Sequence, residues 1–170
     1  AAVAADKPFD AELMAKLDRL SGQALSPDDS TLVWQLRQTD YAANKGRSSI
    51  WTMPVTGGTP QRWTANEMGA NSPSWSADGS SVYFLAAADG VSQLWNQARG
   101  GKAEQVTHFP IDVDTYKLSP DGKQLLVSAS VFTDCTDLAC TKQKLDAKSK
   151  DKATGVLYDR LFVRHWDTWA

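Results

Sequence analysis

Few residues of this chain have side chains whose chemistry could carry out a reaction. The 170-residue sequence has two histidines, His108 and His165, and a serine, Ser92, that follows Gly90 but lacks the second glycine of a Gly-x-Ser-x-Gly elbow. His108 precedes Phe109 and Pro110 in an expected loop, and His165 lies in an expected strand. Because acyl transfer needs a serine held against a base, and no motif presents such a pair, we assign no catalytic residue and expect no cofactor.

The two cysteines, Cys135 and Cys140, are separated by four residues. A lone pair supplies half of a four-ligand metal site, and neither histidine stands at a spacing that would complete one. The spacing also differs from the Cys-x-x-Cys redox motif. We therefore favour a structural disulfide over metal ligation or free thiols, and we expect no metal. A disulfide is typical of an oxidising compartment.

The composition limits the classes of partner. The formal net charge is −2, which gives no reason to expect a nucleic acid. No apolar run approaches the roughly 18 to 20 residues that span a bilayer, so no membrane partner is expected. The small residues Ala1 to Ala5 before Asp6 are typical of a processed signal sequence, which predicts a periplasmic or secreted protein. A remnant of cloning or a disordered tail is the alternative interpretation.

A repeated phrase organises the chain. It begins at Ser26 (Ser-Pro-Asp-Asp), Ser76 (Ser-Ala-Asp-Gly) and Ser119 (Ser-Pro-Asp-Gly), and an apolar strand follows each copy. Proline presets φ, aspartate bonds back to the backbone, and glycine adopts the left-handed conformation, so each copy predicts a hairpin turn. The serines lie 50 and 43 positions apart, close to the 40 to 50 residues of a propeller blade.

Further elements recur after each strand. Two segments, Ser49 to Pro54 and Gln93 to Gln97, each lead to a pair of glycines, and an outer strand follows. Each repeat therefore reads as four short antiparallel strands, and we expect several of the seven tryptophans to pack between neighbouring blades. The fold class predicted is all-β, a partial β-propeller.

The predicted organisation has two parts. Residues 1–21 form a tail and a short helix, with Asp10 as its cap and Leu13, Leu17 and Leu20 at helical spacing. Residues 22–170 form an incomplete propeller, with blades at about 22–64, 72–107 and 115–170. A helical, cysteine-containing insertion at 132–158 interrupts the third blade, and a strand at 157–169 follows it. The lysine-rich part of the insertion indicates a solvated face or, less strongly, an anion site.

Together, the repeated turns, the preceding helix, the insertion and the segment Tyr158 to Trp169 resemble the N-terminal propeller of the prolyl oligopeptidase family. The nearest branch is the bacterial dipeptidyl peptidase and acylaminoacyl peptidase-like enzymes, and the resemblance covers essentially the whole chain. The turn repeat alone also looks like the propeller of a periplasmic Tol-system protein. In the peptidase family the propeller caps an α/β-hydrolase domain that carries the catalytic triad, and no such domain is present in these residues.

The resemblance implies a function and its partners. It implies a propeller that gates and positions short peptides for a serine peptidase, with the α/β-hydrolase domain of the same protein as its partner. The insertion would help to form the site for the substrate N-terminus, where Asp134 is a candidate to hold an ammonium group, with a solvated loop as the alternative. A non-enzymatic periplasmic propeller that binds another protein is the alternative function. The sequence leaves the oligomeric state open, a homo-oligomer included.

Overall fold

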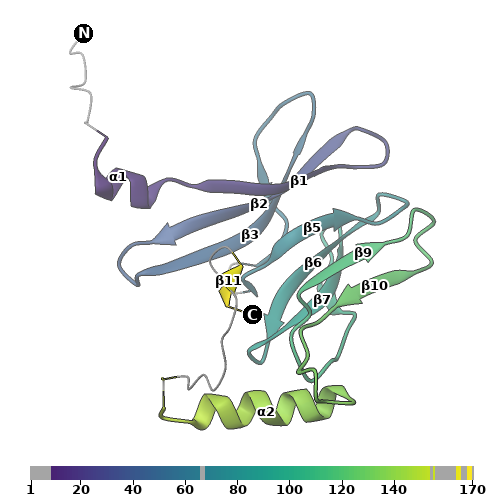
Figure 1. Cartoon of the computed structure of the whole chain (residues 1–170). Helices are drawn as coiled ribbons and strands as arrows, with labels where there is room; N and C mark the ends of the chain where they lie inside the picture. The colour runs from purple at the N-terminus through teal and green to yellow at the C-terminus, as the bar shows by residue number, and fades with distance from the viewer. Residues whose placement is uncertain (1–8, 66–67, 154, 156–163, 166–167, 170) are drawn as a thin grey trace.

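The computed structural model describes residues 9–65, 68–153, 155, 164–165 and 168–169 (Figure 1). Two four-stranded antiparallel sheets follow one another along the chain, each with its strands in sequence order. The first blade consists of β1 (Arg19–Leu25), β2 (Thr31–Asp40), β3 (Lys45–Pro54) and β4 (Gln61–Arg62). The second consists of β5 (Asn71–Trp75), β6 (Ser81–Ala88), β7 (Val91–Ala98) and β8 (Ala103–Gln105). The predicted all-β fold with four-stranded propeller blades is therefore confirmed.

The repeated phrase forms the turn between the first two strands of each blade. In the second copy Asp78 accepts hydrogen bonds from the Ser76 hydroxyl at 2.6 Å and from the Ser80 backbone N–H at 3.1 Å. The Ser76 hydroxyl in turn accepts the Ser81 N–H at 3.0 Å, which closes the turn. The other two copies repeat this arrangement around Asp28 and Asp121. The turn is stabilised almost entirely by its own residues, which is why its sequence predicts it.

A buried apolar cluster joins the two blades. Its fully buried members are Val33, Ile50, Ala70, Val82 and Phe84. Two indole N–H groups also cross between the blades: Trp63 donates to the Gln97 carbonyl and Trp75 to the Ala24 carbonyl, both at 3.3 Å. The Trp63 and Trp75 rings meet edge to face with centroids 5.6 Å apart. These tryptophans therefore pack between blades, as expected from the repeat.

The first blade has a second face that points away from the second blade. Trp34 and Trp51 oppose each other across β2 and β3. Because successive side chains of a strand alternate between faces, both lie opposite Val33 and Ile50, which contact the second blade. We call this the outer face of the first blade.

The N-terminal helix is shorter than its apolar spacing suggests. Helix α1 covers Ala11–Lys16, and Asp10 caps it by accepting the Leu13 N–H at 2.7 Å. Leu17 is its C-cap, whereas Leu20 already belongs to β1 and pairs with Leu36 of β2. The expected helical stripe from Leu13 to Leu20 is therefore wrong, because pairing with β2 outweighs the marginal stability of a short helix.

The third repeat is half a blade, followed by a helix. Strands β9 (Thr115–Leu118) and β10 (Leu125–Ser128) pair antiparallel and pack on the second blade. Helix α2 (Leu138–Lys150) follows within the insertion, as predicted. The single strand expected over 157–169 is not observed where the structure describes it, because β11 (Arg164–His165) pairs antiparallel with β12 (Thr168–Trp169). The remainder of that segment lies outside the described residues.

Candidate functional site on the hairpin side

The blades have two unlike sides. The three repeated turns precede β2, β6 and β10 and lie together at the upper right of Figure 1. The opposite ends of these strands lead to the β2–β3 hairpin, the β6–β7 turn and the insertion with α2. We call this second side the hairpin side. Helix α1 also lies there, since it runs directly into β1.

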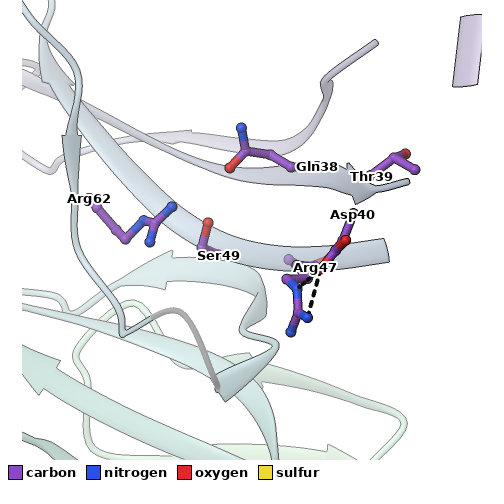
Figure 2. A pocket seen from close by; sticks show the side chains of 7 residues that line it. Gln38, Thr39, Asp40, Arg47, Ser49 and Arg62 are labelled. Atoms are coloured by element: carbon purple, nitrogen blue, oxygen red, sulfur yellow. Dashed lines mark hydrogen bonds and ion pairs between the residues drawn. The ribbon is translucent and has the colours of Figure 1, made fainter. Parts of the chain in front are cut away.

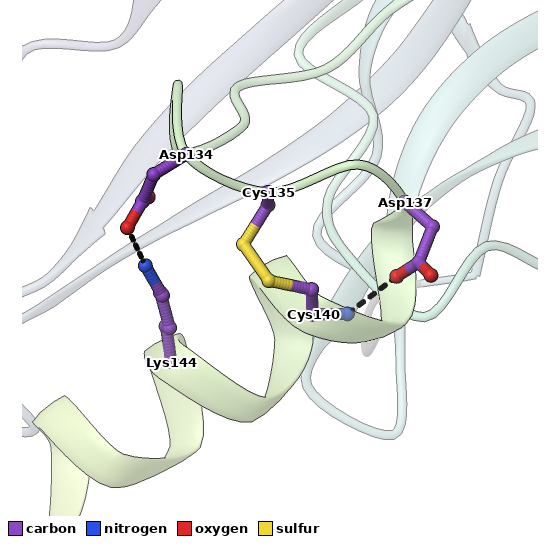
Figure 3. Close-up of a disulfide and its surroundings, with 5 residues drawn as sticks. All are labelled: Asp134, Cys135, Asp137, Cys140 and Lys144. Atoms are coloured by element: carbon purple, nitrogen blue, oxygen red, sulfur yellow. Dashed lines mark hydrogen bonds and ion pairs between the residues drawn. A yellow bond between two sulfur atoms is a disulfide. The ribbon is translucent and has the colours of Figure 1, made fainter.

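The insertion is fixed to the start of α2 by a disulfide (Figure 3). Cys135 and Cys140 are bonded, with their Cα atoms 5.6 Å apart, as the sequence indicates. The adjacent Asp137 caps the helix, because its Oδ1 accepts the Cys140 N–H at 2.7 Å. The loop that carries Asp134 is therefore anchored at both the sulfur bridge and the helix cap.

Asp134, the predicted ammonium site, already holds a cation of this chain. Its carboxylate forms an ion pair with the Lys144 ammonium of α2 (Figure 3). The hydrogen bond from Lys144 is the main cause that lowers the Asp134 pKa below its ordinary value. Lys144 also lies 5.5 Å from the centroid of the Phe132 ring, at cation–π distance. Asp134 thus has the charge and the exposure, at 70% of its side-chain surface, to exchange one ammonium for another.

The residues that resemble catalytic groups have other roles. The Ser92 hydroxyl donates to the Val113 carbonyl at 3.1 Å, and the Ser92 N–H donates to Asp112 at 2.6 Å, so this serine secures the loop before β9. His108 is exposed beyond the end of β8, and His165 belongs to β11. Over the part of the chain that the structure describes, no three His, Cys, Asp or Glu side chains are grouped to hold a metal ion. No described helix is long and apolar enough to cross a membrane.

A polar pocket on the first blade was not predicted from the sequence. It has a volume of about 440 Å³ and opens beside the end of the β2–β3 hairpin (Figure 2). Its lining residues all come from β2, β3 and β4: Gln38, Thr39, Asp40, Arg47, Ser48, Ser49 and Arg62. The signal in the sequence is a difference between repeats, because Trp51 pairs with Arg62 where the second blade pairs Trp95 with Gln105.

The two arginines of this pocket differ in their contacts. Arg47 donates from Nε and Nη2 to one carboxylate oxygen of Asp40, at 3.1 and 2.8 Å, and this contact lowers the Asp40 pKa. Arg62 lies over the Trp51 ring, with its guanidinium carbon 5.0 Å from the ring centroid. In Figure 2 its side chain extends toward Ser49. The pocket can therefore offer hydroxyl, amide and guanidinium donors to one ligand.

Comparison with known proteins places these sheets among peptidase propellers. No family model matches the chain. It is 33% identical over 160 residues, 93% of its length, to dipeptidyl-peptidase 5 of Porphyromonas gingivalis, of which it spans only 22%. The acylaminoacyl peptidase of Pyrococcus horikoshii superposes with a TM-score of 0.59 at 17% identity, over 76% of this chain and 21% of that one.

A second solved structure gives the same fold. The β-propeller domain of the Trilobed protease from Pyrococcus furiosus superposes with a TM-score of 0.51 at 18% identity, over 66% of this chain and 34% of that one. At these identities the two structural matches establish the propeller fold, and the sequence match connects that propeller to peptidases.

Proposed function

Because the chain is part of a propeller domain of the kind found in these peptidases, we propose that it gates and positions short peptides for a serine-type peptidase. The bond cleavage itself would belong to a companion α/β-hydrolase domain of the same protein. The reaction would be of the dipeptidyl, acylaminoacyl or oligopeptidase type. The observation that carries the proposal is the sequence match to dipeptidyl-peptidase 5, which extends over 93% of this chain and so includes the insertion.

The insertion supplies the contact to the substrate in this proposal. Asp134 would hold the peptide's α-ammonium group, which would replace Lys144. The exchange is inexpensive, because an exposed ion pair contributes little net free energy and the departing ammonium returns to water. The disulfide would hold Asp134 in place during the exchange, since it anchors the loop to α2. A site anchored in this way also favours a periplasmic or secreted location, where disulfides persist.

The proposal is tested with Asp134→Asn in the full-length protein, assayed with chromogenic dipeptide substrates that have a free N-terminus. Loss of this exposed ion pair, which contributes up to about 1 kcal/mol, should raise KM by up to about fivefold and change kcat little. Asp146→Asn is the matched control, because it removes the carboxylate of another aspartate–lysine pair, Asp146 with Lys142, both of which lie on α2. Equal KM values for the two variants would overturn the role of Asp134, and no hydrolysis by the unmodified full-length protein would overturn the peptidase proposal.

The 170-residue chain alone provides a second test. Without a nucleophile, a base and an oxyanion hole in register, it should hydrolyse none of these substrates. A serine-directed fluorophosphonate should therefore leave the chain unlabelled. Hydrolysis that the probe blocks, with label on Ser92, would place the active site within these blades. Stable capture of a folded protein by a full-length protein without peptidase activity would instead support the non-enzymatic alternative.

A further inference from the structure

We infer that the ammonium site in the insertion has two ligands, the Asp134 carboxylate and the face of the Phe132 ring, and that Lys144 is its internal competitor. The inference rests on the proposed function in taking Asp134 as the ligand of a peptide's α-ammonium group. It adds an aromatic ligand to that site and a lysine that a peptide must displace. The Lys144 ammonium contacts both ligands in the structure.

A tight turn places the ring and the carboxylate in one short segment. Phe132 to Cys135 form this turn, and a hydrogen bond from the Cys135 N–H to the Phe132 carbonyl closes it at 3.0 Å. Asp134 is the third residue of the turn. The disulfide between Cys135 and Cys140 attaches the turn to the first turn of α2 (Figure 3). Both ligands are therefore held beside the helix by a covalent bond.

The helix brings an ammonium group to this turn. Lys144 follows Cys140 by four positions, about one helical turn, so the two residues share a face of α2. Its ammonium forms an ion pair with Asp134 and lies 5.5 Å from the centroid of the Phe132 ring. A carboxylate accepts the N–H groups of a primary ammonium, and the electron-rich face of a ring attracts its positive charge. Lys144 therefore marks the position that the α-ammonium group of a peptide would take.

A second group of the same composition lies on α1 and provides a control. Lys16 bonds to Glu12 at 2.5 Å, and its ammonium lies 5.2 Å from the centroid of the Tyr41 ring. Glu12 and Lys16 are four residues apart on one helix, so their pair forms with the helix itself. Asp134 and Lys144 are ten residues apart and join a turn to a helix. Displacing Lys144 leaves that turn in place, because the disulfide attaches it.

The competition has a size that follows from the strength of an exposed ion pair. While Lys144 occupies the site, only the remaining fraction of molecules can accept a peptide. An exposed pair of ordinary strength should therefore weaken peptide binding about two- to sixfold relative to the free site. Lys144 also hides the contribution of the ring, because the lysine gives up the same contact that the peptide gains. The contribution of Phe132 is fully measurable only when Lys144 is removed.

The test of the competitor is an NMR titration of the 170-residue chain with Ala-Ala-amide, which has a free α-ammonium group and no carboxylate. The backbone N–H signals of Asp134 and Cys135 should shift, and N-acetyl-Ala-Ala-amide should cause no comparable shift. Lys144→Ala should tighten binding about two- to sixfold. The matched variant Lys142→Ala removes a lysine that pairs with Asp146 on the same helix, and it should leave binding unchanged.

The ring is tested in the Lys144→Ala background, where the competing contact is gone. Phe132→Leu should weaken binding of Ala-Ala-amide about two- to fivefold, as the loss of an exposed cation–π contact predicts. Phe132→Tyr keeps the aromatic face and should retain the affinity. Tyr41→Leu is the matched control, because it removes the ring that lies over Lys16, and it should have no effect.

Each other outcome would overturn the inference. Binding of the acetylated peptide as tight as that of Ala-Ala-amide would show that the ammonium group is not recognised. Equal tightening by Lys144→Ala and Lys142→Ala would show a general charge effect, and unchanged binding in Phe132→Leu would remove the ring from the site.

Asp134→Asn separates this inference from the proposed function. If this variant binds Ala-Ala-amide as tightly as the unmodified chain, the role of Asp134 in the proposed function fails together with the inference. If it loses the shift while Phe132→Leu keeps full affinity, the inference alone is wrong. The titration measures binding without hydrolysis, so an inactive full-length protein would overturn the peptidase proposal and leave this result standing.

Discussion

The repeated turns of neighbouring blades touch, and one substitution measures that contact. Gly79 has φ +70°, and a Cβ atom added to it would lie 3.3 Å from Cδ of Pro27 in the preceding turn. Gly100 has nearly the same backbone, with φ +69°, but an added Cβ would meet nothing within 4 Å. Gly79→Ala and Gly100→Ala therefore share the same backbone strain and differ in the contact with the next blade.

The expected free energies follow from three terms. A left-handed conformation costs an alanine about 1 to 2 kcal/mol. Replacing glycine also removes freedom from the unfolded chain, which returns about 0.4 to 1 kcal/mol. Gly100→Ala should therefore lower the free energy of unfolding by about 0 to 1.6 kcal/mol. Gly79→Ala should cost about 1 kcal/mol more, because crowding against the Pro27 ring adds an overpacking penalty near the lower end of its range.

Urea denaturation followed by tryptophan fluorescence gives both values, and Pro27→Ala supplies the control. In the Pro27→Ala background the ring is gone, so adding Gly79→Ala should cost no more than Gly100→Ala does in the unmodified chain. Equal costs for the two glycine substitutions in the unmodified chain would refute the stacking of successive turns. The stacking would also be refuted if Pro27→Ala failed to reduce the cost of Gly79→Ala.

Three further measurements test the structure. Thiol titration of the denatured, unreduced chain should find no free sulfhydryl, because Cys135 and Cys140 are bonded; two free thiols would contradict the disulfide. Hydrogen bonds led by those from neighbouring serine hydroxyls hold the pKa of Asp28 and Asp78 at about 2, below the ordinary 3.8. Their contribution to stability should be complete above about pH 4 and lost as the pH falls toward 2, and Asp78→Asn should make that loss shallower in acid titrations. Phe84→Ala should lower the free energy of unfolding by about 3 to 5 kcal/mol in urea, and a change below 1 kcal/mol would contradict its place in the core.

The features that the sequence predicts are those that depend on neighbouring residues. The turns at Asp28, Asp78 and Asp121 are fixed within six positions by a serine, an aspartate and a residue in the left-handed conformation, which is Asp29 in the first turn and glycine in the other two. The cap at Asp10 is local in the same way. The end of α1 is not local, because Leu20 joins a strand only when β2 is available to pair with it.

The polar pocket escaped prediction for a different reason. Arg47 and Arg62 lie fifteen positions apart and on different strands, so the sequence gives no sign that they share a cavity. Their proximity follows from the register of β3 with β4, in which Trp51 faces Arg62. Aligning the two blades would have shown the substitution of Gln105 by Arg62.

The charged groups on the two sides of the blades are held differently, and this difference bears on where the proposed peptide contact would lie. On the turn side, Asp28, Asp78 and Asp121 are saturated by their own serines and backbone, so a ligand would have to displace several short bonds to bind there. On the hairpin side, Asp134 holds the exposed and replaceable ammonium group of Lys144. Binding costs less where donors and charges are already in place but not consumed. Recognition of a peptide by these blades is therefore expected on the hairpin side, while the turn side maintains the stacking of one blade on the next.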